Sequence, residues 1–533
     1  MLGRFFALAA CALPLTSALP KIHAKGKYLY DESGNRFYIK GVAYQEAGEL
    51  GPETEANTAN GVSDWEGYPE PSTYIDPLSI PSACNRDLPY LKQLGVNAVR
   101  IYSVNSQLNH DDLHRSMQGW RLVSNNVFVS IDLSLPLNGS INRAAPSWTT
   151  SLQSLYTDTI DAFAKYNNVS RLSLAPLLII LTTITAAARD IKAYLKSKGS
   201  SALVGYSTVD ASAIRDNVVQ YLTCDKAETS VDCSCSSSAT RNRPRVPSVP
   251  VPAYLSEFGC QKELPRLFTE VPAMFSDAMT TVWSGGVAFS YFKAQIPDFE
   301  LVTLSGSNNE TVTTNADFTR LQNAYASVTP TNSPAEGSAT QLPYSTCPAE
   351  SDTWLASNNL PPTPQQSVCD CLTSTTFSCV ATNQAAQSPL ILGSLLDYGC
   401  SLLGQAGGAN CDAIAENGQT GTYGKYGFCD PVTKLNYVMS TYYQSQNRNV
   451  DACSFNNNAT VNTGAPSSTS DIDQNASKCL AGFVPTSTPT ANPGGGSSGG
   501  SGSSGGSNGA VSMGVSAMFV GFAGILGAAT LIL

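Results

Sequence analysis

The stretch DLPYLKQLGVNAVRIYSV, residues 87–104, combines two kinds of hydrophobic spacing. Its first half has apolar residues at helical intervals, and its second half, NAVRIYSV, has the β-branched and aromatic content of a strand. A helix that leads directly into a strand is the repeating step of α/β folds. We therefore expect this stretch to be one such step in a larger sheet.

The same alternation continues on both sides of this stretch. KYLY and FYIKGVAY precede it as strand-like segments, and NNVFVSIDLSLP and the helix-like TSLQSLYTDTIDAFAKY follow it. Over residues 19–330 this rhythm predicts an α/β fold, a (β/α)8 TIM barrel, in which chemistry takes place at the C-terminal ends of the strands. A doubly wound sheet is the alternative, but the sequence has no Gly-rich phosphate turn to favour it.

The start of the chain has the layout of an export signal. Residues 1–18 combine an early Arg4, an apolar stretch, and the small residues Thr16 and Ala18 at cleavage spacing. These features are typical of a secretory signal peptide. A buried N-terminal helix is the alternative interpretation.

The end of the chain has the layout of a lipid-attachment signal. A Ser/Gly-rich stalk, residues 481–508, leads into the apolar residues 509–533. This pattern predicts a GPI-attachment signal that is removed on maturation, with Asn508 as the attachment residue. A membrane-spanning helix is the alternative, but no Lys or Arg follows the tail as a cytoplasmic stop.

Composition agrees with export and excludes some partners. Of fifteen cysteines, Cys11 lies in the signal, so an even number remains for disulfides. The net charge of −10 argues against a nucleic-acid partner, and three His without an HExxH motif argue against a His-built metal site. The N-glycosylation sequons are at Asn138, Asn168, Asn309, Asn458 and Asn475.

A second, smaller unit follows the predicted barrel. Residues 331–366 are rich in Pro, Ser and Thr and are typical of a linker. Residues 367–480 are dense in cysteine, which predicts a small disulfide-rich α+β module. Zinc is the weaker alternative, because these thiols would lie in an oxidising compartment.

Polar side chains stand at the ends of several predicted strands. Glu257 lies near the end of VPAYLSEF, Asp132 near the end of FVSID, and Tyr102 follows NAVRI. Gln45 follows IKGVAY, and Tyr291 follows SGGVAFS. A barrel directs its strand ends to one place, so we expect these five to line a single cleft, although any one of them alone is an ordinary surface residue.

Several strings in order resemble one family. GVAYQ, NAVRIYSV, DLSLPLNGSINRAAPSW, YLSEFGC and SGGVAFSYF are similar to the fungal cell-wall β-1,3-glucanosyltransferases of glycoside hydrolase family 72. LLDYGC, NCDAIAENG, YGFCDP and YVMSTYYQ resemble the family 43 carbohydrate-binding (X8) module that often follows that catalytic domain. The export signal, stalk and GPI tail complete the same layout.

The resemblance implies a retaining transglycosylase that acts on β-1,3-glucan as donor and acceptor and needs no cofactor. Such an enzyme uses two carboxyl groups about 5–5.5 Å apart, one as nucleophile and one as acid/base. Glu257 takes the nucleophile position, and Gln45, Tyr102, Asp132 and Tyr291 fall at substrate-binding positions. Tyr291 is the weakest match, because Phe289 stands where that family often has Tyr. The implied location is the outer leaflet of the plasma membrane, and the cell wall.

The sequence departs from the family pattern in three places, residues 110–126, 170–186 and 225–249. The first lacks an expected Cys, which would pair with Cys84, and the third lacks a motif that carries a cleft Tyr. The second should contain the Asn-Glu pair of the acid/base. Instead it reads SRLSLAPLLIILTTITA, with no Asp or Glu.

Three interpretations of this apolar run stay open. It is a fault in the gene structure from which the chain was translated, it belongs to a glucan-binding wall protein without catalysis, or it is an ordinary core strand or helix. A spanning helix fits worst, because the run is short and contains Pro176. The absence of the acid/base residue affects the expected rate, because general acid–base catalysis is worth about 10²–10⁴-fold in rate. An endo-glucanase is a third candidate function.

The module contains aromatic residues that are candidates for stacking on sugar rings. The alternative is that most of them pack its small core, as buried aromatic residues often do. The candidates are Tyr423, Tyr426, Phe428, Tyr437, Tyr442 and Tyr443.

Overall fold

A computed structural model gives the arrangement of most of the chain. It describes residues 21–46, 75–111, 127–133, 146–166, 169–174, 181–208, 215–236, 249–259, 261, 264–293, 299–351, 354–405, 410–481 and 483. The predicted signal peptide, the GPI signal, Asn508, Asn138 and Asn168 lie outside these residues. No helix within the described ranges combines the length and the apolar character needed to cross a membrane.

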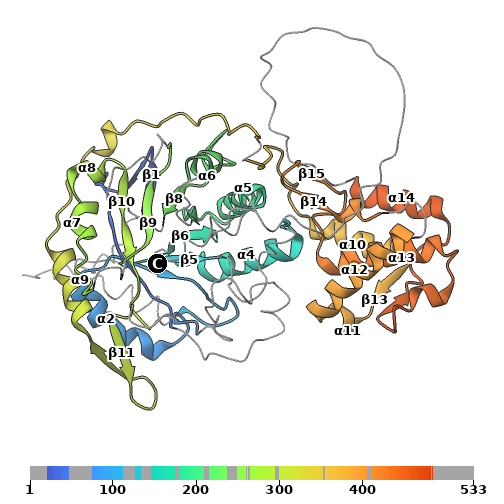
Figure 1. Cartoon of the computed structure of the whole chain (residues 1–533), viewed down its shortest axis with the longest axis horizontal. Coiled ribbons are helices and arrows are strands. Elements are labelled where there is room, and N and C mark those ends of the chain that lie inside the picture. Colours follow the sequence, from blue (N-terminus) through green and yellow to red (C-terminus); the bar gives the residue numbers. More distant parts are fainter. Residues whose placement is uncertain are drawn as a thin grey trace, which may run out of the picture.

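Eight parallel strands close into a barrel, which confirms the predicted (β/α)8 architecture (Figure 1). Neighbouring strands follow one another in chain order, and the eighth pairs with the first. In order they are β3 (Ile39–Ala43), β4 (Ala98–Ile101), β5 (Phe128–Asp132), β6 (Val169–Leu174), β7 (Leu203–Thr208), β8 (Cys233–Ser236), β9 (Ala253–Phe258) and β10 (Trp283–Ala288).

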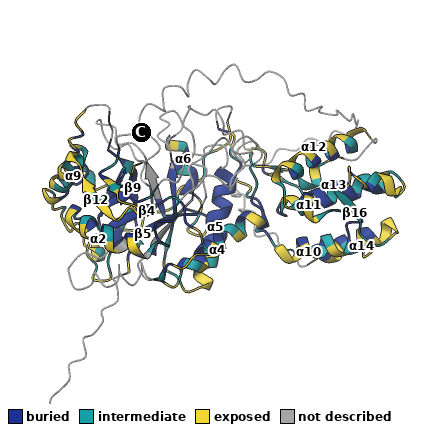
Figure 2. Cartoon of the chain, turned by 90° about the horizontal axis from the view of Figure 1, so that it is seen from below, coloured by how far each residue is buried: buried dark blue, intermediate teal, exposed yellow. Residues whose placement is uncertain are grey.

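Helices surround the barrel and cover its apolar outer surface (Figure 2). The predicted helix-to-strand step at residues 87–104 is present: α2 ends at Leu94, and Gly95 adopts a left-handed φ of 73° that turns the chain into β4. The helices are α2 (Pro81–Leu94), α4 (Thr150–Phe163), α5 (Leu181–Ser197), α6 (Arg215–Leu222), α7 (Glu270–Met274), α8 (Asp277–Thr280) and α9 (Ala316–Ala326).

Two short hairpins complete this part of the chain. In the first, β1 (His23–Lys25) pairs with β2 (Tyr28–Tyr30), and the fully buried Leu29 packs against residues near the starts of the barrel strands. This hairpin covers the N-terminal end of the barrel and leaves the C-terminal rim for a site. The second hairpin pairs β11 (Val302–Ser305) with β12 (Thr311–Thr314).

The apolar run of residues 170–186 contributes to two elements. Its first residues form β6, the fourth barrel strand, and its last residues form the buried start of α5. Ile184 and Ala186 are at most 2% exposed. Among the described residues the run therefore supplies a barrel strand and the buried start of a helix, and the three interpretations above remain predictions.

The predicted linker follows the barrel surface as an ordered strap (Figure 1). The hydroxyl of Tyr30 donates to the carbonyl of Pro334 at 3.0 Å, and a disulfide joins Cys224 to Cys347. Further along, Trp354 is only 5% exposed. These contacts fix the path of the predicted linker. The segment includes the 3₁₀ turn Glu336–Ser338.

The C-terminal module packs several helices around two small sheets. Four disulfides lie within it: Cys369–Cys429, Cys371–Cys479, Cys379–Cys453 and Cys400–Cys411, which confirms the predicted disulfide stapling. The helices are α10 (Gln366–Thr375), α11 (Asn383–Ala386), α12 (Pro389–Gln405), α13 (Pro431–Ser445) and α14 (Thr469–Leu480), with 3₁₀ turns at Asp412–Ile414 and Val450–Cys453. The strands are β13 (Cys379–Ala381), β14 (Glu416–Asn417), β15 (Thr422–Tyr423) and β16 (Ala459–Val461).

The module docks on the N-terminus of α4. The backbone N–H of Thr150 donates to the carbonyl of Phe428 at 2.9 Å, and the N–H of Trp148 donates to the Glu416 carboxylate at 3.0 Å. The first N–H groups of a helix have no partner inside the helix. The module therefore satisfies donors at the beginning of a barrel helix.

This junction makes stability depend on pH through Glu416. Burial raises the pKa of Glu416 from 4.5 to about 7, with Lys434 and the Trp148 N–H acting in the opposite direction. Lys434 on α13 is the cation facing it, and burial lowers the pKa of that ammonium. Because the folded-state pKa is raised, the stabilising contribution is complete below pH about 4.5 and is lost as pH rises through about 7.

We expect Glu416→Gln to remove this pH dependence. Relative to the variant, the unmodified chain should lose up to about 3 kcal/mol of unfolding free energy between pH 4.5 and 8, a figure reduced by any solvent that reaches the carboxylate. Thermal unfolding midpoints across this range measure it. Glu32→Gln, at an exposed position, is the matched control. Parallel pH profiles for the unmodified chain and the Glu416 variant would contradict the assignment.

Candidate active site

Glu257 occupies the C-terminal end of β9, the seventh barrel strand. Its side chain is 19% exposed, so it is held by the protein and still reachable from outside. Two donors meet its Oε1: the hydroxyl of Tyr102 at 2.6 Å and Nη1 of Arg100 at 3.0 Å. Both hydrogen bonds from described residues reach this one oxygen, which leaves Oε2 for chemistry.

Arg100 on β4 connects the two predicted carboxylates. Its Nε and Nη2 donate to the two oxygens of Asp132 at 3.2 and 2.8 Å, while Nη1 donates to Glu257. The guanidinium is 3% exposed. Burial lowers the pKa of Arg100, but Asp132, Tyr102 and Glu257 raise it more, so the net pKa lies well above its ordinary value. Arg100 is therefore a permanent cation between two acids.

Tyr102 remains a hydrogen-bond donor throughout the working pH range. Burial raises its pKa well above the ordinary value, and the adjacent Glu257 carboxylate raises it further. The guanidinium of Arg100 also lies over its ring, 4.5 Å from the centroid. The phenol thus stays protonated and fixes one oxygen of Glu257.

Gln45 supports the site through the backbone. Its Oε1 accepts from the N–H groups of Tyr102 at 3.1 Å and Ser103 at 2.9 Å, and its Nε2 donates to the carbonyl of Ile75 at 2.7 Å. These bonds occupy both ends of the amide. In this arrangement Gln45 positions the end of β4 beside Glu257.

Tyr291 lies apart from this group. It is fully buried, and its hydroxyl donates to Asp87 at 3.3 Å, beside Tyr44, which donates to the same carboxylate at 2.6 Å. Burial raises the pKa of Tyr291 above its ordinary range. The aromatic ring beside Tyr102 is instead Phe289, with ring centroids 6.4 Å apart.

Sequence reasoning missed Arg100, although the sequence carried a signal for it. An arginine in the apolar strand NAVRIYSV has to be buried, and a buried cation needs an anionic partner. Glu257 and Asp132, each at the end of its own strand, were the available partners.

No carboxyl group is available at the end of the fourth strand. β6 ends at Leu174, and the chain has no Asp or Glu from residue 162 to residue 189. Burial raises the pKa of Asp132, at the end of the third strand, and Arg100 acts in the opposite direction. Both oxygens of Asp132 accept hydrogen bonds from Arg100, so this carboxyl is committed to that pair. Among the described residues, Glu257 therefore has no second carboxyl group at the end of the fourth strand to act with it.

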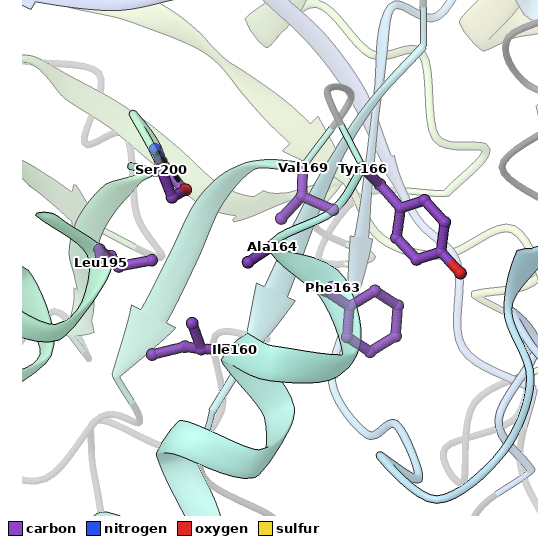
Figure 3. Close-up of a pocket in the computed structure, with 8 residues that line it drawn as sticks. Ile160, Phe163, Ala164, Tyr166, Val169, Leu195 and Ser200 are labelled. Atoms are coloured by element: carbon purple, nitrogen blue, oxygen red, sulfur yellow. Dashed lines mark hydrogen bonds between the residues drawn. The ribbon is translucent and has the colours of Figure 1, made fainter. Parts of the chain in front are cut away.

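Other features of the described residues offer no second centre. They contain no group of three or more His, Cys, Asp or Glu side chains arranged to hold a metal ion. A small gap lies between α4 and α5, lined by apolar side chains such as Ile160, Phe163 and Leu195 (Figure 3). It adjoins Val169, at the start of β6, so it lies at the end of the barrel opposite Glu257.

Comparison with known proteins finds matches for both parts of the chain. A family model described as Glucanosyltransferase matches residues 12–329, and a model described as X8 domain matches residues 377–460. The 1,3-beta-glucanosyltransferase gas1 of Schizosaccharomyces pombe is 35% identical over 468 residues, which are 84% of this chain and 79% of that protein. The 1,3-beta-glucanosyltransferase of Arthroderma benhamiae is 33% identical over 463 residues, 82% of this chain and 78% of that protein.

Solved structures show the same architecture. Saccharomyces cerevisiae Gas2p in complex with laminaripentaose has a TM-score of 0.70 at 29% identity, and the match covers 84% of this chain and 98% of that one. A mutant of the same protein, with laminaritetraose and laminaripentaose, gives a TM-score of 0.69 at 28% identity, covering 87% and 98%.

Proposed function

This chain belongs to the glucanosyltransferase family, and from that premise we propose that it is a retaining β-1,3-glucanosyltransferase. It cleaves a β-1,3-glucan and transfers the new reducing end to another glucan chain. The observation that carries this proposal is Glu257, placed at the end of the seventh strand and held by Tyr102 and Arg100. The family match and the names of the relatives support the substrate class.

The reaction starts with attack by Glu257. Its Oε2 bonds to C1 of the donor sugar, and the C1–O bond to the leaving glucan breaks with its electron pair on that oxygen, which takes a proton from water where no side-chain acid supplies one. An acceptor hydroxyl then attacks C1 from the opposite side, gives its proton to the hydroxide left by that water and displaces the Glu257 carboxylate. Transfer prevails over hydrolysis when an ordered acceptor occupies the place of water.

Arg100 and Tyr102 serve this step by holding the carboxylate. They fix Oε1, so Oε2 loses less freedom on reaching C1. Gln45 and Asp132 assist indirectly, the first through the backbone of Tyr102 and the second through Arg100. We assign Tyr291 to the wall beside Asp87.

A second candidate function is a glucan-binding wall protein with impaired catalysis. The absence of any carboxylate from residue 162 to residue 189 favours it, because the leaving glucan then departs without a proton from that strand. In this case the protein binds glucan and turns it over slowly.

We further propose the location predicted by the ends of the chain. The signal peptide directs export, and the GPI anchor at Asn508 holds the protein on the outer leaflet of the plasma membrane, with transfer to the wall as a further destination. Of the described sequons, Asn309 is exposed in the β11–β12 turn. Asn458 and Asn475 are partly buried, and their side-chain amides donate to carbonyls of Phe455 and Thr375, whereas the amide of Asn309 donates to the Glu46 carboxylate at the exposed surface. We therefore place the first glycan at Asn309.

Incubation with a reduced β-1,3-glucan oligosaccharide tests the function. Products longer than the donor are the expected result, because transfer adds sugars to an acceptor chain. Shorter products alone would identify an endo-glucanase. Binding without any new product would identify the glucan-binding protein. Chromatographic separation by length, with borohydride-reduced ends to mark the donor, distinguishes the three.

A further inference from the structure

A buried arginine follows the strand that carries Glu257. Arg266 stands between the end of β9 and the start of α7, and it is 2% exposed. A guanidinium stays charged at any pH that the protein meets, so its burial requires partners for its N–H groups. The partners of Arg266 therefore show which parts of the structure this residue holds.

Arg266 donates to three groups from two other segments of the barrel. Its Nη1 donates to the carbonyl of Phe289 at 2.9 Å, and its Nη2 donates to the carbonyl of Phe299 at 3.0 Å. Its Nε donates to the carboxylate of Asp317, in the first turn of α9, at 2.6 Å. Asp317 supplies the opposite charge, and the planar guanidinium directs its other two nitrogens at the two carbonyls. A lysine cannot do the same, because its ammonium is a point charge without this fixed fork.

Phe289 connects this cluster with the candidate active site. It follows β10 directly, its N–H donates to the carbonyl of Phe258 at 2.8 Å, and its own carbonyl is the one that Arg266 binds. Its ring meets the ring of Tyr102 at 6.4 Å with an interplanar angle of 69°, and Tyr102 donates to Glu257. Arg266 is therefore linked to the partner of Glu257 through a single residue.

Gly259 shows how closely this cluster approaches the strand that carries Glu257. Its φ of 117° lies in the region that favours glycine. A Cβ at this position would lie 3.3 Å from the carbonyl oxygen of Phe289 and 3.6 Å from Nη1 of Arg266. The chain that leaves β9 thus passes beside the hydrogen bond between Arg266 and Phe289, and a change in that bond acts directly on this segment.

We propose that Arg266 is a positioning residue for the transfer reaction. By binding the carbonyls of Phe289 and Phe299, it keeps the ring of Phe289 against Tyr102 and the Tyr102 hydroxyl on Oε1 of Glu257. This inference rests on the proposed function and deepens it. Arg266 is too deeply buried to touch a sugar, so it acts through the position of the reacting carboxylate, where a displacement of about 1 Å can cost 10²-fold in rate.

Fluoride release from a β-1,3-glucan oligosaccharide with a β-fluoride at C1 tests this role, because the step needs attack by Glu257 and no acid. Arg266→Met is expected to lower kcat about 10- to 100-fold and to leave KM within about threefold of its original value. The reason is that the lost contacts serve the reacting carboxylate and not the binding of sugar.

Arg266→Lys separates the charge of this residue from its geometry. The lysine keeps a cation beside Asp317, so the thermal midpoint should stay near that of the unmodified chain. One ammonium does not hold both carbonyls, so kcat should remain at least about tenfold lower. This variant also keeps the test valid if Arg266→Met fails to fold. A kcat for Arg266→Lys equal to that of the unmodified chain would overturn the proposal.

Arg320→Met is the matched control. Arg320 lies on α9 with a side chain that is 31% exposed, and within the described ranges its hydrogen bonds all go to Asp317. Its removal takes a cation from the same carboxylate and leaves the bonds to Phe289 and Phe299 in place. We expect an unchanged kcat. A loss as large as that of Arg266→Met would assign both effects to the Asp317 ion pair and remove the positioning role.

Hydrogen–deuterium exchange tests the same contacts without turnover. In Arg266→Lys the N–H of Phe289, which is bonded to Phe258, should exchange at least about tenfold faster than in the unmodified chain. In Arg320→Met its exchange should be unchanged. Equal exchange at Phe289 in Arg266→Lys and in the unmodified chain overturns the inference, even for a protein that gives no glucan product.

The outcomes separate this inference from the proposed function. Fluoride release by the unmodified chain that is no faster than release by Glu257→Gln removes the transferase, and the exchange measurement then decides whether Arg266 holds Phe289. Release above that background, with an unchanged kcat in Arg266→Lys, keeps the transferase and removes the positioning role.

Discussion

Glu257→Gln lowers glucan transfer on the order of 10⁴-fold or more, because the amide oxygen is a poor nucleophile and cannot form the glycosyl ester. The substitution preserves shape and still offers an oxygen to the hydroxyl of Tyr102. Binding of donor should therefore survive while turnover is lost. Elongation of a reduced β-1,3-glucan oligosaccharide measures the rate, and retention on particulate β-1,3-glucan measures binding.

The control for this variant is Glu32→Gln, which removes one carboxylate at an exposed position and should leave transfer unchanged. The variant at residue 257 also leaves Arg100 with one fewer anionic partner, so its thermal midpoint has to be measured alongside. Transfer that persists in a folded Glu257→Gln protein would mean that another group attacks C1.

Donors with a leaving group that needs no proton are expected to react about 10²–10⁴-fold faster than glucan, which is the usual worth of general acid catalysis. In a β-1,3-glucan oligosaccharide carrying a β-fluoride at C1, attack by Glu257 breaks the C–F bond and releases fluoride directly. A fluoride electrode follows this step, and azide intercepts the glycosyl-enzyme as a β-azide.

Three results of the fluoride experiment have different meanings. Fast fluoride release with slow glucan turnover supports a nucleophile without its acid. Equal rates would show that a group outside residues 162–189 supplies the proton. No release above the background of Glu257→Gln would leave only the glucan-binding function.

The placement of Arg100 and Tyr291 shows the limits of motif reasoning. Both residues stand in strings that resemble the family, yet Arg100 donates to Glu257 and Tyr291 donates to Asp87. The position of a residue within a strand determines which face of the sheet its side chain lies on. It does not determine the partner, because that depends on what the neighbouring strands and helices bring within hydrogen-bonding distance.

The aromatic residues of the module also show that sequence motifs do not determine tertiary contacts. They are frequent enough to suggest a sugar-binding face, but in the structure some pack in the core of the module, some contact the strap and some are exposed. Tyr426, Phe428 and Tyr443 are at most 4% exposed, whereas Tyr398 in the cysteine motif LLDYGC is 53% exposed. Its exposure becomes visible only after α12 is packed on α13.

The amino-acid sequence by itself determined the alternation of strands and helices, the disulfide-rich character of the module and the strand that carries Glu257. These features depend on local spacing and composition, which each segment retains wherever it lies. The tertiary structure decided that the strap is ordered, that Gln45 supports the backbone of Tyr102, and that Arg100 joins Glu257 to Asp132. The reason is that burial and hydrogen bonding depend on distances between segments far apart in the chain, and only closure of the barrel sets those distances.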